Sequence, residues 1–507
     1  MKAQLAAVVS LFVLLTFASA PPVLAFLPQP TITLVAAQGD AVGSNTLTLA
    51  GPPAIDASGD VAFHALLGKG KTANFGIVLA SGTTLTFVAD GQTADPVTGA
   101  TFTKLSDPVL SGSGALAFVG TLKPGTGDAT GQNKSAVYVF KNNTSSLVAR
   151  TSGTAPGLGG PTFTAFSQIA VDDFGGVAML AKVSNAKQSP ALFGTDLSGN
   201  LQLLTNKGAT FTLNGSQVAI TSIAAFAPLP LIVGQTRTLD EPTGNIVAML
   251  KGSGGKLGFF VAQPLSNGFN IGSNTNLAGV NKISEPAIDQ FGDFEFSAVL
   301  GGIGVTKANN YAILQSISGT ANLDYRTGNQ APDTSGTSTN AIFTKMSQPL
   351  LNENGSTAFV ASLKVDAAAG VTKANDTGIW SDADGPLKEV VREGDPAPGS
   401  TGKFASFQQL VLPDVGGPIF VAKLSGVPAT GNVGVWAKRT SGIMRVVITG
   451  DQLDVHGTLK TVKKFAIFQL APMVMGQSRS FTASTGEIVF QATFTDGTWG
   501  IYTATLP

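Results

Sequence analysis

The chain contains no cysteine, and only 12% of its 507 residues are charged. Without cysteine there can be no disulfide framework, no iron–sulfur cluster and no zinc site built on thiolates. A typical globular chain carries about 25% charged residues, so disorder driven by charge is excluded. A chain of this length must instead be stabilised by a large hydrophobic core.

Excess charge of either sign is also lacking, because basic and acidic residues both number 31. The chain has no excess of basic residues to attract a phosphate backbone, so we expect no nucleic-acid partner. The only histidines are His64 and His456, which lie in different parts of the chain. A Ser–His–Asp triad has few ways to form from them, so we expect both to be structural. We name no catalytic residue and expect no metal site and no cofactor.

Long hydrophobic runs are scarce apart from one near the N-terminus. The apolar stretch from Leu5 to Phe17 follows Lys2 and has the length of a secretory signal core. Small residues at Ala18 and Ala20 offer one cleavage site, and Val23 and Ala25 offer a second; we prefer cleavage after Ala25. We therefore expect residues 1–25 to be a signal peptide and the mature chain to be secreted, periplasmic or extracellular. No later run reaches about 18 apolar residues, so we expect no membrane span in the mature chain.

Glycine, by contrast, is abundant, with 61 residues, and part of it marks an internal repeat. In each copy a short apolar run ends at a polar residue, glycine follows, and an apolar strand comes next, as in Pro53–Phe63 (PAIDASGDVAF). The separation of Gly114 from Gly355 equals that of Gly175 from Gly416, which indicates a duplicated four-unit block. The eight copies centre on Gly59, Gly114, Gly175, Gly244, Gly292, Gly355, Gly416 and Gly486.

The repeated motif predicts a tight turn between two strands. The polar side chain can accept backbone amides inside the turn, and glycine can adopt the positive φ that closes it. We predict positive φ at Gly59, Gly114, Gly292 and Gly355. The repeated aspartates could also suggest calcium, but each stands alone without companion carboxylates at ligand spacing. We therefore predict turn caps, not metal ligands, at Asp56, Asp172, Asp289 and Asp414.

Each unit offers two further strands, and four strands in roughly 50–70 residues is the size of a propeller blade. The predicted fold class is all-β, a β-propeller of eight four-stranded blades. We expect residues 26–507 to form a single propeller made of two four-repeat halves, about 31–270 and 271–507, and to be a monomer. The last unit is one strand short, so we predict that residues 31–37 pair with residues 499–505 and close the ring.

The motif resembles that of bacterial exported tandem-repeat proteins described by the pattern NxxGxxAF. Asn352–Phe359 (NENGSTAF) shows the same elements, with one more residue between glycine and phenylalanine. The segment Arg392–Gly399 (REGDPAPG) is similar to the linker between such repeats. A looser likeness exists to the TolB-type propeller repeat. The resemblance implies an exported repeat protein and carries no activity.

The sequence leaves two functional hypotheses. We favour a secreted or cell-envelope binding or scaffold protein for an unknown protein or glycan over an enzyme. The alternative is an extracellular propeller enzyme, a glycan hydrolase or lyase with a central carboxylate pair. Trp380, Trp436 and Trp499 are predicted to pack between blades, with stacking on a ligand as the alternative. The candidate ligand-binding residues are Arg237 and Arg479, each a few residues before a variant turn of the duplicated block, although a bridging arginine explains them as well.

Overall fold

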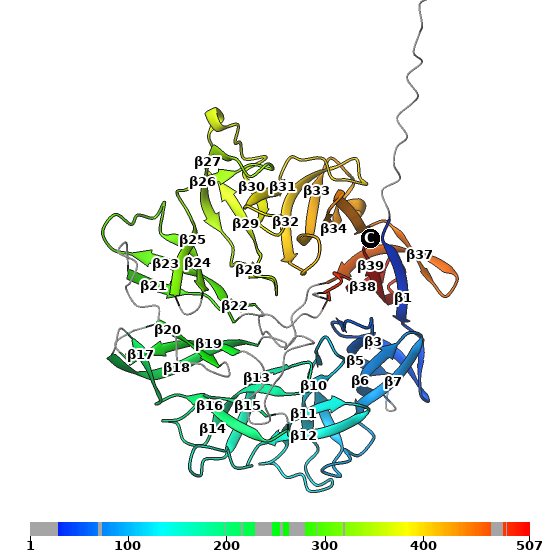
Figure 1. The fold of residues 1–507 in the computed structure, drawn as a ribbon. Helices are drawn as coiled ribbons and strands as arrows, with labels where there is room; N and C mark the ends of the chain where they lie inside the picture. The colour runs from blue at the N-terminus through cyan, green and yellow to red at the C-terminus, as the bar shows by residue number, and fades with distance from the viewer. Residues whose placement is uncertain are drawn as a thin grey trace, which may run out of the picture.

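The computed structural model describes residues 29–68, 73–196, 198–213, 216–228, 246–253, 257–262, 279–289, 292–317, 320–467, 480–482 and 484–507. In this part of the chain eight antiparallel sheets stand around a common axis and form a β-propeller (Figure 1). The predicted fold class is therefore confirmed. Blades are numbered along the chain, and the eighth contains strands from both of its ends.

The first four blades follow one another along the first half of the chain. Blade one has β2 (Ala41–Val42), β3 (Asn45–Ala50), β4 (Ala54–Ile55), β5 (Val61–Leu67), β6 (Asn74–Ser81) and β7 (Thr84–Asp90). Blade two has β8 (Phe102–Leu105), β9 (Val109–Leu110), β10 (Leu116–Leu122), β11 (Ser135–Lys141) and β12 (Thr144–Arg150). Blade three has β13 (Phe163–Val171), β14 (Val177–Val183), β15 (Ala191–Thr195) and β16 (Leu201–Asn206). Blade four has β17 (Thr210–Leu213), β18 (Ser216–Pro228), β19 (Ile246–Gly252) and β20 (Leu257–Ala262).

The second half repeats the arrangement and ends at the closing blade. Blade five has β21 (Gly279–Ile283), β22 (Ala287–Ile288), β23 (Phe294–Gly301), β24 (Tyr311–Ile317) and β25 (Thr320–Arg326). Blade six has β26 (Gln330–Pro332), β27 (Ser338–Met346), β28 (Leu350–Leu351), β29 (Thr357–Leu363), β30 (Thr377–Ser381) and β31 (Lys388–Arg392). Blade seven has β32 (Lys403–Val411), β33 (Ile419–Ser425), β34 (Val433–Arg439) and β35 (Gly442–Ile448). Blade eight has β36 (Gln452–Val455), β37 (Thr458–Ala466), β38 (Ile488–Phe494), β39 (Trp499–Thr505) and β1 (Thr31–Ala37).

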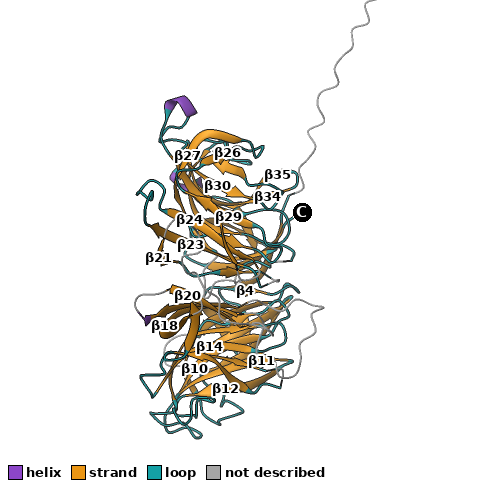
Figure 2. Cartoon of the chain, turned by 60° about the vertical axis from the view of Figure 1, so that its left-hand side comes forward, coloured by secondary structure: helices purple, strands orange, loops and turns teal. Residues whose placement is uncertain are grey.

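Strands make up nearly all of the regular structure, as the orange ribbons of Figure 2 show. The described residues include two short 3-10 helices, η3 (Ala367–Ala369) and η4 (Ala429–Gly431), and no α-helix. The predicted all-β class is confirmed for this part of the chain. None of its helices has the length and apolar character needed to cross a lipid bilayer.

The hydrophobic core lies between neighbouring blades. The phenylalanine at the end of each clear motif copy is at most 1% exposed, as measured for Phe63, Phe118, Phe296 and Phe359. One core cluster joins Ala62 and Ile77 of blade one to Phe102, Phe118 and Tyr138 of blade two. Burying a phenylalanine is worth about 1.5–3 kcal/mol, so the repeated motif supplies a large stabilising contact at each interface.

Aromatic side chains on the third strands complete these cores. Trp380 and Trp436 are fully buried, and their indole N–H groups donate to the carbonyls of Pro332 at 2.9 Å and Pro398 at 3.1 Å. Trp499 is 5% exposed and donates to the carbonyl of Thr48 in blade one at 3.1 Å. The prediction that these tryptophans pack within the protein is confirmed.

The motif turns have the predicted geometry. Gly59, Gly114, Gly292 and Gly355 have φ values of 84°, 85°, 81° and 78°. Asp56 Oδ1 accepts the amides of Ser58 at 2.8 Å and Asp60 at 2.9 Å, and Asp172 Oδ1 accepts those of Phe174 and Gly176. Asp289 Oδ1 accepts the amide of Asp293 at 2.9 Å. These three aspartates are therefore turn caps.

Asp414 is a correction to the sequence analysis, because it does not cap its own turn in this way. Its Oδ1 accepts the backbone amide of Glu353 in the neighbouring blade at 2.9 Å. Asp414 lies two residues before Gly416, whereas the capping aspartates lie three residues before their glycines, and Pro413 occupies the capping position. Because the aspartate lies one residue closer to the glycine, it links two blades and does not cap its own turn.

The ring closes as predicted. β1 pairs antiparallel with β39, with Thr31 opposite Thr505 and Ala37 opposite Gly500. Ala36 and Ile501 join Val61 and Phe63 of blade one in a single hydrophobic cluster. The N-terminal strand therefore completes blade eight and also packs the seam between blades eight and one.

We predict that Gly59→Val lowers the free energy of unfolding by about 1–3 kcal/mol, because a β-branched residue is strained at positive φ. An added Cβ at Gly59 would meet its nearest atom only at 3.9 Å, so the backbone conformation alone causes the loss. Gly131→Val is the matched control, since a Cβ there meets open space and φ is not positive. Denaturant unfolding of both variants checks this, and equal stability of the two would contradict it.

We predict that deleting residues 26–40 removes at least about 3 kcal/mol of stability, because the deletion takes partly buried apolar side chains of β1 out of the seam. It also exposes the edge of β39. The melting temperature of the truncated chain gives the measurement. A synthetic peptide of residues 29–40 added in trans should restore it in part. An unchanged melting temperature would mean that β1 does not hold the ring closed.

Candidate functional site

The arginines proposed from the sequence, Arg237 and Arg479, both lie outside the described residues, as does the signal segment 1–25. Arg237 belongs to the connection between β18 and β19, and Arg479 to that between β37 and β38. Their role as ligand-binding residues stays a prediction.

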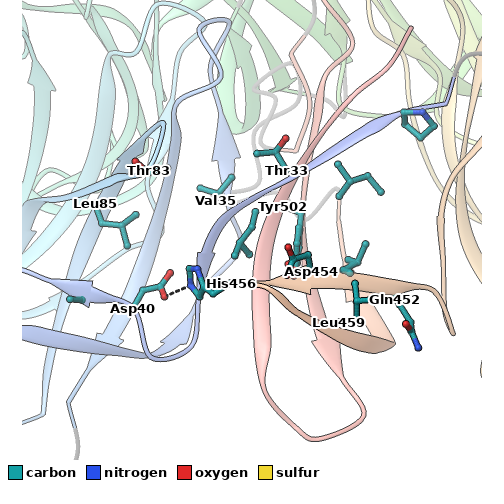
Figure 3. A pocket seen from close by; sticks show the side chains of 15 residues that line it. Thr33, Val35, Asp40, Thr83, Leu85, Gln452, Asp454, His456, Leu459 and Tyr502 are labelled. Atoms are coloured by element: carbon teal, nitrogen blue, oxygen red, sulfur yellow. Dashed lines mark hydrogen bonds and ion pairs between the residues drawn. The ribbon is translucent and has the colours of Figure 1, made fainter.

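A cavity of about 880 Å³ lies at the seam where the ring closes (Figure 3). We call it the seam groove. It is bordered by β1, by the β36–β37 hairpin, and by the start of β7 from blade one. Its lining residues are Pro30, Ile32, Thr33, Leu34, Val35, Asp40, Ala41, Thr83, Leu85, Gln452, Leu453, Asp454, His456, Leu459 and Tyr502.

The groove borders the edge of β1 and not one of its faces. Side chains of consecutive strand residues point to opposite faces. Four consecutive residues, 32–35, nevertheless line the same cavity. In the sheet order β1 is the last strand and pairs only with β39 among the described strands. The groove therefore exposes backbone N–H and C=O groups on the outer side of β1.

A histidine–aspartate pair connects the two walls of the groove. His456 Nε2 lies 2.7 Å from Asp40 Oδ1, and Asp40 Oδ2 accepts the backbone amide of Ala37 at 2.8 Å (Figure 3). His456 has a φ of 51° and Gly457 a φ of 85°, and these two residues form the turn of the β36–β37 hairpin. The hydroxyl of Tyr502 donates to the carbonyl of Asp454 at 2.9 Å and holds the other side of this hairpin.

The groove combines apolar walls with negative charge. Leu459 is 64% exposed although it is a large aliphatic residue, and Leu85 lines the opposite side of the groove (Figure 3). Asp40 and Asp454 are carboxylates, and none of the fifteen lining residues is lysine or arginine. The groove is therefore suited to a partner with apolar and positively charged groups.

His64 does not take part in this site. It lies on β5 in blade one and stacks on Phe75 with ring centroids 6.4 Å apart. Burial lowers its pKa, while the charge of Asp107 opposes the shift. Neither histidine has a serine among the hydrogen-bond partners seen in the described residues, and their assignment as structural stays a prediction.

Three carboxyl groups converge where the motif turns of different blades meet. Asp173 Oδ1 accepts the amide of Ser113 at 3.0 Å, just as Asp414 Oδ1 accepts that of Glu353. The pKa of Glu353 is raised to about 8, mainly by burial. The charges of Asp414 and Asp173 and a hydrogen bond to Asp414 contribute the rest of the shift. Burial also raises the pKa of Asp414 and of Asp173. Glu353 therefore keeps its proton at neutral pH.

This carboxyl group was not identified from the sequence, although a signal was present. Asp173, Glu353 and Asp414 all lie two residues before the motif glycine, next to the capping position. The repeated motif predicts a role only for the capping position. A buried arginine was also missed: Arg439 is 7% exposed, and its Nη2 donates to the carbonyl of Gly486 in the turn of blade eight at 3.4 Å.

A second acidic cluster is buried between blades five and six. Glu295 is fully buried, and its Oε2 accepts the hydroxyl of Thr357 at 2.9 Å. Asp382 accepts the hydroxyl of Tyr325 at 3.1 Å. Burial, followed by the charge of Asp324, raises the pKa of Glu295 well above its usual range, and burial raises that of Asp324 to about 6. Glu295 Oε1 has no hydrogen-bond partner among the described residues.

We predict that Glu295→Gln stabilises the protein at high pH. The folded state binds more protons than the unfolded state above the usual carboxyl pKa, so stability falls as the pH rises. A neutral glutamine removes that loss. One pKa unit is worth about 1.4 kcal/mol, and we expect at least this gain at pH 9 relative to pH 5. Denaturant unfolding at both values gives the measurement, with Glu487→Gln at a motif turn as the control; parallel pH dependences of E295Q and wild type would refute it.

No group of three or more histidine, aspartate or glutamate side chains in the described residues is arranged to hold a metal ion.

The fold and the seam groove define the protein as an eight-bladed β-propeller with an open cavity at its closure. The chain belongs to a family of unknown function, DUF7453, whose model matches residues 24–266 and again 270–507. No curated protein matches it.

Solved structures similar to this chain include other propellers. The propeller domain of the Trilobed protease from Pyrococcus furiosus is 8% identical, with a TM-score of 0.36, and the match covers 80% of this chain and 97% of that one. PorZ, a surface component of the type-IX secretion system of Porphyromonas gingivalis, is 13% identical with a TM-score of 0.35, covering 87% of this chain and 55% of PorZ. A polysaccharide lyase described as an ulvan lyase is 10% identical with a TM-score of 0.31, covering 94% and 96%. This chain thus spans little more than half of PorZ.

Proposed function

We propose that this protein is an exported binding or scaffold module that holds its ligand in the seam groove. The observation that carries the proposal is a cavity of about 880 Å³ that borders an open strand edge and displays an exposed leucine. Binding pockets are typically concave, largely apolar, and provided with a few placed polar groups. The apolar N-terminal stretch and the resemblance to exported NxxGxxAF repeat proteins support export.

A second candidate is an extracellular enzyme acting on glycans, favoured by Glu353, whose pKa of about 8 would suit a general acid. The position of the neighbouring carboxyl group of Asp414 argues against an enzymatic role. Glycoside hydrolases separate their two carboxyl groups by about 5–5.5 Å or 6.5–9.5 Å, so that a sugar or a water fits between them. Glu353 and Asp414 instead share a hydrogen bond, and Asp414 also holds the backbone of Glu353. The pair is better explained as a link between two turns.

The binding function is tested by retention from the extracellular fraction of cells that make the protein. We expect immobilised wild-type protein to retain a protein or glycan that Leu459→Lys retains at least about tenfold less, which corresponds to 1.4 kcal/mol. Leu459 is exposed, so its replacement leaves the core intact. Glu353→Gln, remote from the groove, should retain the same material as wild type. Retention of nothing, or equal retention by L459K, would refute the proposal.

The enzymatic alternative is tested separately on a panel of acidic and neutral polysaccharides. New reducing ends report hydrolysis, and ultraviolet absorbance of new double bonds reports a lyase. We expect no product from wild-type protein. Product formation that disappears in Glu353→Gln, with an unchanged melting temperature, would make the enzyme the correct assignment.

A further inference from the structure

The outer edge of β1 carries no charged residue, as is also true of the outer strands β16 and β20, and it borders the seam groove. Proteins commonly guard an open strand edge with charged residues, proline or a bulge, because unpaired backbone groups attract other chains. The outer strand β31 begins with Lys388, and β35 carries Arg445. β1 reads TITLVAA and contains no charged residue, and its first four residues precede the bulge between Leu34 and Ala36. Residues 31–34 therefore form an unguarded edge.

The cavity beside this edge has the shape that an added strand requires. A strand that pairs with an edge lies about 4.7–4.9 Å from it and directs its side chains alternately to both sides. Residues from both faces of β1 line the groove, so the cavity lies beside the backbone edge of the strand and extends outward from it. Leu85 and Thr83 of blade one bound one side, and the β36–β37 hairpin with Leu459 bounds the other (Figure 3). Alternate side chains of an incoming strand would meet these two walls.

The charges of the walls select the chemistry of the partner. Asp40 and Asp454 face a groove whose lining contains no lysine or arginine. Asp40 has His456 at 2.7 Å and the amide of Ala37 as partners, and Asp454 Oδ1 accepts the amide of Gly457 at 2.6 Å. Neither carboxylate has a basic side chain from lysine or arginine as a partner in the described residues. A cationic side chain next to them gains a charge-assisted hydrogen bond.

From these observations we infer that the seam groove binds an extended peptide segment with alternating apolar and basic side chains, which adds to the outer edge of β1 as a further strand. The inference rests on the proposed binding function and names its ligand class. Backbone pairing with residues 31–34 gives affinity, and the leucines and carboxylates of the walls give specificity, as in other cases of strand addition.

The probe is an acetylated and amidated eight-residue peptide of alternating valine and lysine, titrated into the mature protein by calorimetry. Two control peptides separate the contributions. One replaces lysine by glutamate, and the other keeps the side chains but N-methylates alternate residues, which blocks pairing. We expect at least about tenfold weaker binding of the glutamate peptide and no measurable binding of the methylated one. Hydrogen exchange should show new protection of the amides of residues 31–34.

Two protein variants locate the site. Leu459→Lys should weaken binding of the valine–lysine peptide at least tenfold, because it removes an apolar contact and adds a like charge. Ile303→Lys is the matched control, since Ile303 is fully exposed in blade five, and it should bind as wild type does. Equal binding of the methylated peptide, or equal binding by L459K, would overturn the strand-addition model.

The outcomes distinguish this inference from the function on which it rests. If wild-type protein retains native material in a groove-dependent way but does not bind the valine–lysine peptide, the ligand class is wrong and the binding function stands. If native retention does not depend on Leu459, the proposed function itself fails. If the glutamate peptide binds more tightly, the charge argument is refuted.

Discussion

The pairing of β1 with β39 is the contact on which the rest of the structure depends. It supplies the outermost strand of blade eight and places Ala36 in one hydrophobic cluster with Trp499 of the same blade and Phe63 of blade one. Without it the last blade would end at an open edge, and its neighbour would lose a packed face. The seam groove also depends on this pairing, because β1 borders the groove and Tyr502 of β39 holds the β36–β37 hairpin.

The sequence predicted the features whose causes are local. Gly59 and its counterparts show positive φ because a short polar turn between two strands requires it, and that requirement is visible in eleven consecutive residues. The closure was predictable for a different reason, since a missing strand at one end of the repeat matched an extra strand at the other. Asp414 was misassigned because its partner, Glu353, lies in another blade, and a motif within one blade does not reveal such a contact.

The seam groove was not predictable from the sequence, because its lining comes from segments far apart in the chain. β1, the turn before β7 and the β36–β37 hairpin meet only when the ring closes. His456 illustrates the difficulty: nothing in its neighbourhood indicates that Asp40, near the other end of the chain, will be its partner. The raised pKa of Glu353 depends likewise on Asp173, which a different half of the chain contributes.

The copies of the repeat share their apolar residues and differ in their polar ones, and the differences indicate where to look for function. The duplicated block makes a similar link twice, from the Ser113 amide to Asp173 and from the Glu353 amide to Asp414. Glu353 stands where the first copy has Gly112, so only the second copy adds a third carboxyl group. Glu295 stands where blade one has Ala62, which places a buried carboxyl group between blades five and six. A ring needs only the shared residues to close, so the fold does not require these carboxyls or the unguarded edge of β1. The blade that carries this edge combines strands from both ends of the described chain. In its groove Leu459 is exposed whereas Leu453 and Tyr502 belong to the core, so only the exposed part of the lining is free to vary without disturbing the core.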